Sequence, residues 1–233
     1  MRVLTTPPQL LLHFSIKLFM KRLNIKSLPE LAEMRISEVG SYLTATTLWH
    51  QIKCLNWPGQ FDHKPLTKFM IARSESALYI HYKVEETDVK AVYTLDQDPV
   101  WQDSCVEFFV KLPNEEGYAN FEFNCIGTAL ATKRKSRDED VRPYSEDEML
   151  SIERHASLGR EALELNGKTN WELTVKIPFS LIGIKTIDKT MPLHTNLYKC
   201  GDATAHPHYL SWSEIDTPTP DFHRPEFFGI MNL

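Results

Sequence analysis

The stretch SCVEFFVK at residues 104–111, followed by ANFEFNCIG at 119–127, determines the expected fold. Both segments are rich in β-branched and aromatic residues, which favours extended strands. Between them lie Pro113, Asn114 and Gly117, which are residue types typical of turns. The two segments are therefore predicted to pair as a hairpin with a longer loop.

Alternation gives each of these strands two unlike faces, because successive side chains of a strand point to opposite sides of the sheet. The core faces hold Val106, Phe108 and Val110 in the first segment and Phe121, Phe123 and Cys125 in the second. The opposite faces carry Glu107, Glu122 and Asn124. If the hairpin forms, these three polar side chains lie on one sheet face, with Trp101 at its rim. The alternative is that this face is merely solvated.

Strand-like segments recur along the rest of the chain. The others cover residues 68–73, 77–84, 89–95, 171–179, 208–213 and 227–233. Many short strands without alternating helices predict an all-β fold, an antiparallel β-sandwich of jelly-roll or immunoglobulin-like type. Trp171 is in phase with Leu173, Val175 and Ile177, which predicts a core position for this Trp.

One segment breaks the pattern of strands. Residues 133–148 carry five basic and six acidic side chains, so this insertion is predicted to be a solvated loop. Ser145 and Glu148 have the spacing of a capping box, which predicts one short helix after the loop. The neighbouring charges of both signs largely cancel, which argues against a nucleic-acid patch.

Length and composition favour a single domain. The chain has 233 residues, 42% of them hydrophobic, and a net charge of −5, which makes nucleic acid an unexpected partner. We expect one β-sandwich over residues 20–233. Residues 1–19 are interpreted as an upstream extension or a degenerate export signal, too short and polar to span a membrane. A cytoplasmic location is favoured, and export follows if residues 1–20 are a signal.

Cysteine and histidine residues suggest little metal chemistry. The four cysteines, at 54, 105, 125 and 200, form no C-x-x-C pair, and Cys105 and Cys125 are expected to be buried; whether any pair forms a disulfide is left open. His206, His208 and His223 raise the alternative of a metal- or haem-binding sandwich, since an H-x-H on a strand places both rings on one face. With Pro207 between the first two, loop histidines are the preferred interpretation.

The polar face with its neighbouring Trp has the chemistry of a saccharide site. Carboxylates and carboxamides offer fixed acceptors, and Asn also donors, to adjacent hydroxyl groups. An aromatic ring suits the apolar C–H face of a sugar. Trp212 lies on another strand-like segment, so two rings, Trp101 and Trp212, could hold a sugar from both sides; for both residues a packing role is the alternative.

The segments DPVWQDSCVEFFV, YANFEFNCIG, WELTVKIPFSLIG and HYLSWSEIDTPTPDFHRPEFFGIMNL resemble the family 9 carbohydrate-binding modules, particularly stand-alone family-9-like proteins. The resemblance runs from about Leu43 to Leu233. It implies a β-sandwich that binds saccharides between two Trp rings, with a Glu six residues after the first Trp.

The residues Trp101, Glu107 and Asn124 match the family pattern, and Trp212 is the best candidate for the second ring. Glu122 and Tyr209 depart from it, since they stand where the pattern has a basic residue and an Asn. Some modules of the family that this chain resembles bind calcium. No EF-hand-like D-x-D-x-D-G loop is present, so no calcium ligands are assigned and no other cofactor is expected.

Catalysis is the main alternative to binding. A glycoside hydrolase needs two carboxylates across a cleft, which Asp103, Glu107 and Glu122 could nominally supply. Carboxylates on one sheet face are more typical of ligand binding, so non-catalytic saccharide binding is preferred. The family resemblance implies glycan catabolism as the setting and a glycoside hydrolase as a companion. No G-x-S-x-G elbow or glycine-rich phosphate loop supports serine hydrolase or nucleotide chemistry.

Overall fold

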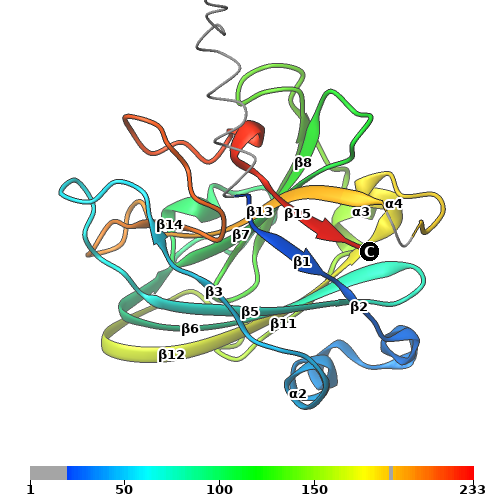
Figure 1. The fold of residues 1–233 in the computed structure, drawn as a ribbon. Helices are drawn as coiled ribbons and strands as arrows, with labels where there is room; N and C mark the ends of the chain where they lie inside the picture. Colours follow the sequence, from blue (N-terminus) through cyan, green and yellow to red (C-terminus); the bar gives the residue numbers. More distant parts are fainter. Residues whose placement is uncertain (1–19, 189–190) are drawn as a thin grey trace, which may run out of the picture.

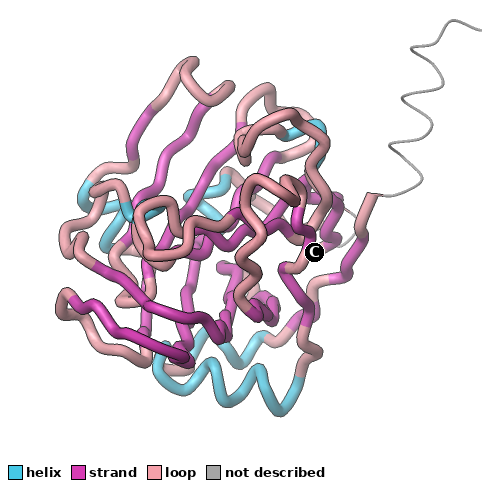
Figure 2. The backbone as a smooth tube through the Cα atoms, turned by 90° about the vertical axis from the view of Figure 1, so that its left-hand side faces the viewer, coloured by secondary structure: helices cyan, strands magenta, loops and turns pink. Residues whose placement is uncertain are grey.

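The structure is a computed structural model that describes residues 20–188 and 191–233. The expectation of an extension or signal over residues 1–19 lies outside the described residues. Two β-sheets face each other (Figures 1 and 2). Most of the buried apolar side chains lie between them. Among the described residues, no helix is long and apolar enough to cross a membrane.

The larger sheet has nine strands in the described part of the chain. In spatial order, its main path is β1 (Arg22–Asn24), β15 (Gly229–Asn232), β13 (Pro192–Cys200), β7 (Cys105–Lys111), β8 (Tyr118–Asn124), β9 (Ala129–Arg134) and β10 (Arg142–Pro143). Two short strands branch from β13: β14 (Tyr209–Ser211) pairs with it, and β4 (Cys54–Leu55) pairs with β14.

The smaller sheet has six strands in the same described ranges. Its order is β11 (Glu153–Ala156), β12 (Leu163–Pro178), β6 (Ala77–Ala91), β5 (Leu66–Arg73) and β2 (Lys26–Ser27), with β3 (His50–Ile52) also paired to β5. The expected strands at 77–84 and 89–95 are largely one element, because β6 continues to Ala91 and pairs with β12 along nearly its whole length.

The predicted all-β sandwich is confirmed, but its sheets are mixed rather than purely antiparallel. The pairs β1 with β15 and β2 with β5 are parallel. The amide of Ile25 donates to the carbonyl of Asn232 (2.8 Å), and the amide of Leu28 donates to the carbonyl of Arg73 (2.8 Å). One short segment therefore completes an edge of both sheets, which strand patterns elsewhere in the chain do not reveal.

The core between the sheets contains the residues that alternation assigned to it. The core faces of β7 and β8 contribute Val106, Phe108, Phe121 and Phe123, all fully buried. Trp171 is 1% exposed, and its indole N–H donates to Glu86 (2.7 Å), so its predicted core position is confirmed. Cys105 and Cys125 are buried as expected, and all four cysteines are free thiols.

Of two α-helices that pack on the sandwich, the sequence predicted one and missed the other. Helix α3 (Glu146–Leu150) lies in the charged insertion and has the predicted capping box between Ser145 and Glu148. Helix α2 (Ile36–Thr46) was not predicted, and it covers the outer face of the smaller sheet (Figure 1). No side chain caps its N-terminus, so the usual start signal is absent.

The remaining helical elements are short. They are α4 (Phe179–Ile182) and the 3-10 turns η1 (Pro29–Glu33), η2 (Val100–Gln102) and η3 (Pro225–Phe227). Of these, η2 matters for the site, because it directly precedes β7 and carries Trp101.

Candidate ligand-binding site

A pocket of about 290 Å³ opens on the outer face of the larger sheet, away from the core between the sheets. We call it the outer-face pocket. Its walls are Trp101, Glu107, Glu122, Leu130, Arg134, Arg137, Asp138, Cys200, Asp202, Tyr209, Pro220, Asp221, Phe222 and His223. The strands β7, β8, β9, β13 and β14 thus supply one side, and loops supply the other.

An aromatic layer outside the sheet holds these loops in place. Tyr198 on β13 stacks on Phe222, with ring centroids 4.1 Å apart and planes 9° apart. The Tyr198 hydroxyl donates to the carbonyl of Phe222 (3.0 Å). The segment containing Phe222 and His223 is therefore fixed against the sheet, and it closes one wall of the pocket.

Glu107 and Glu122 lie directly opposite each other on β7 and β8, which confirms that they share one sheet face. Unlike side chains on a solvated face, they are 3% and 4% exposed. Oε1 of Glu107 accepts from the thiol of Cys200 (3.0 Å), and Oε1 of Glu122 accepts from Asn120 (2.8 Å). Oε2 of Glu122 is buried and has no hydrogen-bond partner.

The acids of the pocket are hard to ionise. Burial raises the pKa of Glu122 to about 7. Burial, and secondly the facing Glu122 carboxylate, raise the pKa of Glu107 well above its ordinary value. Burial also raises the pKa of Asp202 to about 6. Near neutral pH the two facing glutamates therefore retain protons at least in part, so their carboxyl groups donate as well as accept hydrogen bonds, whereas Asp202 is largely ionised.

The charged insertion forms the basic wall of the pocket. The Arg134 guanidinium donates to the Thr132 hydroxyl (2.9 and 2.7 Å), and it also donates to the carbonyl of Arg137 (2.8 Å). Arg137 in turn pairs with Asp221 (3.4 Å). Most of the insertion is exposed as predicted, but its sequence did not indicate that these two arginines line a ligand pocket. The available signal was the alternation of Arg134 with Thr132 and Leu130 on β9.

Trp101 is the exposed aromatic of the pocket. It lies on η2, and 37% of its surface is open to solvent. The amide of Asp202 donates to its carbonyl (3.3 Å), so the backbone of this turn is joined to the end of β13. The ring is thus held on a defined backbone while its surface is available at the pocket.

Asn124 is on the expected face but does not line the pocket. Its side-chain amide donates to the carbonyl of Tyr93 (2.8 Å) and to Asp103 (3.0 Å), and its oxygen accepts from the amide of Thr128 (2.9 Å). Asp103 also accepts from the amides of Val92 and Tyr93. Asn124 and Asp103 therefore fasten loops to the sheet, and neither is placed to contact a ligand in the pocket.

Trp212 is not the second ring of the pocket, which corrects the expectation from sequence. It is 4% exposed in the core between the sheets, edge-on to Phe69 with centroids 6.3 Å apart. Alternation explains this position, because Leu210 and Trp212 face the core whereas Tyr209 faces outward. Tyr209 lines the pocket in its place.

The histidines singled out by the sequence do not form a metal site together. Both ring nitrogens of His208 are engaged, Nδ1 with the carbonyl of His206 (2.7 Å) and Nε2 with Lys199 (2.8 Å). His223 lies elsewhere, in the pocket wall, hydrogen-bonded to Tyr118 (2.8 Å). Burial, with Arg134 and Arg137 nearby, lowers the pKa of His223 to about 3, so this ring is neutral.

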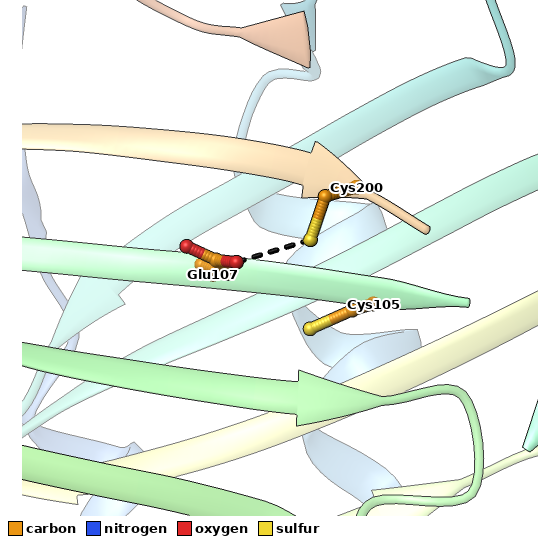
Figure 3. A group of neighbouring side chains, drawn as sticks. All are labelled: Cys105, Glu107 and Cys200. Carbon is orange, nitrogen blue, oxygen red and sulfur yellow. Dashed lines mark hydrogen bonds between the residues drawn. The ribbon is translucent and has the colours of Figure 1, made fainter. Parts of the chain in front are cut away.

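Among the described residues, one group of potential metal ligands converges, namely Cys105, Glu107 and Cys200. Calcium takes six to eight oxygen ligands, so a group with two sulfurs does not fit it. Figure 3 shows that the thiol of Cys200 and the carboxylate of Glu107 come from neighbouring strands and meet beside Cys105.

A β-sandwich whose outer sheet face carries an aromatic and carboxyl-lined pocket belongs to the class of small-ligand binding modules. The model of carbohydrate-binding family 9 matches residues 41–233, and the chain belongs to this family. It is therefore a carbohydrate-binding module, as its sequence motifs indicated. No match was found among curated proteins.

Solved structures agree with this assignment. A protein from Bacteroides uniformis, described as a candidate carbohydrate-binding protein, is 34% identical with a TM-score of 0.86, covering 91% of this chain and 99% of that one. A family 9 module from Caldicellulosiruptor kristjanssonii has been solved with glucose (11% identity, TM-score 0.53, 91% and 95% covered). A family 9 module from Caldicellulosiruptor kristjanssonii has also been solved with cellotriose. It is 10% identical with a TM-score of 0.52, covering 91% of this chain and 93% of that one. Because the glucose and cellotriose complexes are only 11% and 10% identical to this chain, they show that the fold is shared.

Proposed function

We propose that the chain binds a saccharide in the outer-face pocket without cleaving it, with Trp101 as the stacking platform and Glu107 and Glu122 as hydrogen-bonding groups. The observation that supports this most directly is Oε2 of Glu122, a buried pocket oxygen without a partner. An unsatisfied buried polar group costs about 1–3 kcal/mol. A ligand hydroxyl supplies the missing hydrogen bond and recovers part of that cost.

A sugar fits the other walls as well. Its apolar C–H face suits the exposed ring of Trp101, and its hydroxyls suit carboxyl groups and the guanidinium of Arg134. Family membership and the sugar complexes of related modules support the same ligand class. We propose that Tyr209 also contacts the sugar, in the role that was expected of Trp212.

The arrangement of the carboxyl groups argues for binding rather than hydrolysis. A glycosidase uses two carboxyl groups that flank the scissile bond. Glu107 and Glu122 come from adjacent positions on neighbouring strands and project from one sheet face. A sugar lying on that face meets both groups from the same side. The third nominal acid, Asp103, is engaged with backbone amides.

We further propose that the protein serves glycan catabolism as the companion of a glycoside hydrolase. This proposal follows from the binding role and from the family, in which binding modules bring a catalyst and its polysaccharide together. Co-purification of a hydrolase with the tagged chain from its own cells, and its loss on adding free ligand glycan, are the expected observations.

The test of the binding site begins with a glycan array that includes glucose and cellotriose, followed by calorimetry with the glycan that binds best. Glu107→Gln and Glu122→Gln keep the side-chain shape but change the hydrogen-bonding groups, and each should weaken binding about 2- to 10-fold, since an uncharged hydrogen bond contributes about 0.5–1.5 kcal/mol. Glu164→Gln, on the exposed part of the other sheet, is the matched control and should bind normally. Equal affinities for all four proteins would place the site elsewhere, and release of reducing ends from any glycan would show catalysis.

A further inference from the structure

A second set of chemically capable side chains, the group formed by Cys105, Glu107 and Cys200, lies at and just beneath the floor of the outer-face pocket. One ligand atom from each, the two Sγ atoms and a carboxylate oxygen, lie within 4.8 Å of one another. All three residues are buried. We refer to them as the Cys-Glu-Cys group.

The fold holds this group in place through the sheet itself. Cys105 and Glu107 are two residues apart on β7, so their side chains project from the same face. Cys200 on β13 lies directly opposite Cys105 in the antiparallel register. Because paired strands fix the spacing of their side chains, the three ligand atoms are brought together without any loop.

The group includes a buried carboxyl group that lacks an ion-pair partner among the described residues. None of the ion pairs in the described ranges includes Glu107, although its carboxyl group is buried. Its hydrogen-bond partner is the Cys200 thiol, at 3.0 Å. Apolar neighbours, among them Val100 and Tyr198, surround the two cysteines. A buried carboxyl group beside two thiols, with no positive partner, is a site where a divalent cation would gain its full electrostatic stabilisation.

The donor set selects the type of ion. Two thiolates and one carboxylate suit zinc, whose Zn–S and Zn–O distances of about 2.3 and 2.0–2.2 Å place tetrahedral ligand atoms about 3.5–3.8 Å apart. The three ligand atoms lie within 4.8 Å of one another, so zinc binding requires them to move somewhat closer together. Glu107 and Cys200 line the pocket whereas Cys105 does not, so an ion can enter from the pocket side.

We infer that Cys105, Glu107 and Cys200 bind one Zn²⁺ ion, with the fourth coordination position open toward the outer-face pocket. Binding forms two Zn–S bonds and one Zn–O bond, and the protons of the two thiols and of the Glu107 carboxyl group pass to water. Three protein ligands with one open position is the arrangement of zinc sites that accept an exogenous oxygen ligand. This inference does not rest on saccharide binding.

The first test uses cobalt as the probe, because Co²⁺ replaces Zn²⁺ and absorbs light when bound to thiolates. The full chain, kept reduced with a phosphine and freed of metal, is titrated with Co²⁺ alone. We expect one equivalent to produce the near-ultraviolet thiolate-to-cobalt band, which Zn²⁺ then abolishes by displacement. If no such band appears in the reduced wild-type protein, the inference is wrong.

Variants test the ligand assignment. Cys105→Ala and Cys200→Ala should weaken Zn²⁺ binding by at least about 100-fold, since removal of even an outer partner of a ligand commonly costs 10- to 100-fold. Glu107→Gln should also weaken Zn²⁺ binding while the thiolate-to-cobalt band persists. Cys54→Ser is the matched control, because this half-buried thiol lies outside the group. If Cys54→Ser lost as much Zn²⁺ affinity as the cysteine variants of the group, the ligand assignment would be wrong.

Two further measurements keep the inference testable if a cysteine variant folds poorly. Zn²⁺ should raise the wild-type melting temperature, since an ion that binds only the folded state stabilises it. Thiol alkylation of the unfolded, unreduced protein should modify all four cysteines. If Cys105 and Cys200 are both protected from alkylation, they form a cross-strand disulfide in place of a metal site. The absence of any shift in melting temperature with Zn²⁺ would also contradict the zinc inference.

Discussion

Trp101 and Trp171 show how one residue type takes two roles in this molecule. Trp101 is partly open to solvent at the pocket, while Trp171 is buried in the core and hydrogen-bonded to Glu86. The difference comes from the backbone on which each stands. Trp101 is the middle residue of a short 3-10 turn, and Trp171 lies on the core face of a long strand.

Substitution of these residues separates binding from stability. Trp101→Ala should weaken saccharide binding by about 1–3 kcal/mol, with aromatic stacking of planar ligands as the guide. Its free energy of unfolding should fall by less than about 1 kcal/mol. Trp171→Ala should instead destabilise the fold by about 3–5 kcal/mol. Calorimetry and urea unfolding of both variants provide the comparison, and a large stability loss in Trp101→Ala would assign this ring to packing.

Glu122 gives the fold a pH dependence of known sign. Its pKa is about 7 in the folded protein against an ordinary value of 4.5. Between these values the unfolded chain has released its proton and the folded chain retains it. The free energy of unfolding therefore falls as pH rises from about 4.5 to 7, by up to about 3 kcal/mol at 1.36 kcal/mol for each pKa unit.

Glu122→Gln removes this contribution and keeps the shape of the side chain. Relative to the wild type, the variant should gain stability as pH rises from 5 to 8. Urea unfolding of both proteins at the two pH values measures the effect, and the difference between the proteins cancels the other titrating groups. A stability difference that is the same at pH 5 and pH 8 would contradict a raised pKa at this carboxyl.

At the scale of elements, the site depends on loops fastened to the strands of the larger sheet. Asn124, at the end of β8, binds the backbone of Tyr93 and Thr128 and the carboxylate of Asp103. Asp103 follows the turn that carries Trp101 and lies two residues before the start of β7. The sequence pattern placed Asn124 among the ligand-binding residues, and the structure gives its hydrogen bonds to the protein itself.

Asn124→Ala should therefore act first on stability. It leaves buried partners unsatisfied, each costing about 1–3 kcal/mol, so a loss of at least about 2 kcal/mol is expected in urea unfolding. Saccharide affinity of the folded fraction should change less than in Glu107→Gln. The opposite pattern, with normal stability and strongly reduced affinity, would return Asn124 to the binding site.

At the scale of the whole molecule, a buried ion pair joins the two sheets. Lys199 on β13 and Glu86 on β6 are 2.8 Å apart, and both side chains are almost fully buried. Lys199 also donates to the carbonyl of Cys200 (2.9 Å) and contacts His208. The ion pair thus connects the strand that carries Cys200 to the opposite sheet.

Lys199→Met should destabilise the protein by about 3–5 kcal/mol, because it leaves the Glu86 carboxylate buried without its cation. The double variant Glu86→Gln with Lys199→Met should recover part of this loss, since it removes both charges. A double-mutant cycle by urea unfolding measures the coupling. Additive effects of the two substitutions would mean that the pair contributes nothing beyond its separate side chains.

The sequence by itself determined the features that depend on local alternation. It predicted the sandwich, the β7–β8 hairpin, the common face of Glu107 and Glu122, the core position of Trp171 and the capping box of α3. Each follows from neighbours a few residues apart along the chain. The motif resemblance added the carbohydrate-binding family, which the family match and fold confirm. Even Trp212 could have been placed correctly from its phase with Leu210.

Only the tertiary structure decided what the polar sheet face became. The pairing of β7 with β13 brings Cys200 beside Glu107, and the folded loops bring Arg134 and Phe222 to the pocket. These residues are far apart in sequence, so their meeting depends on strand order and loop packing rather than on any local pattern. Burial under the loops then removes water from two facing carboxyl groups. That desolvation raises the pKa values of the two carboxyl groups on the face that was predicted to be polar.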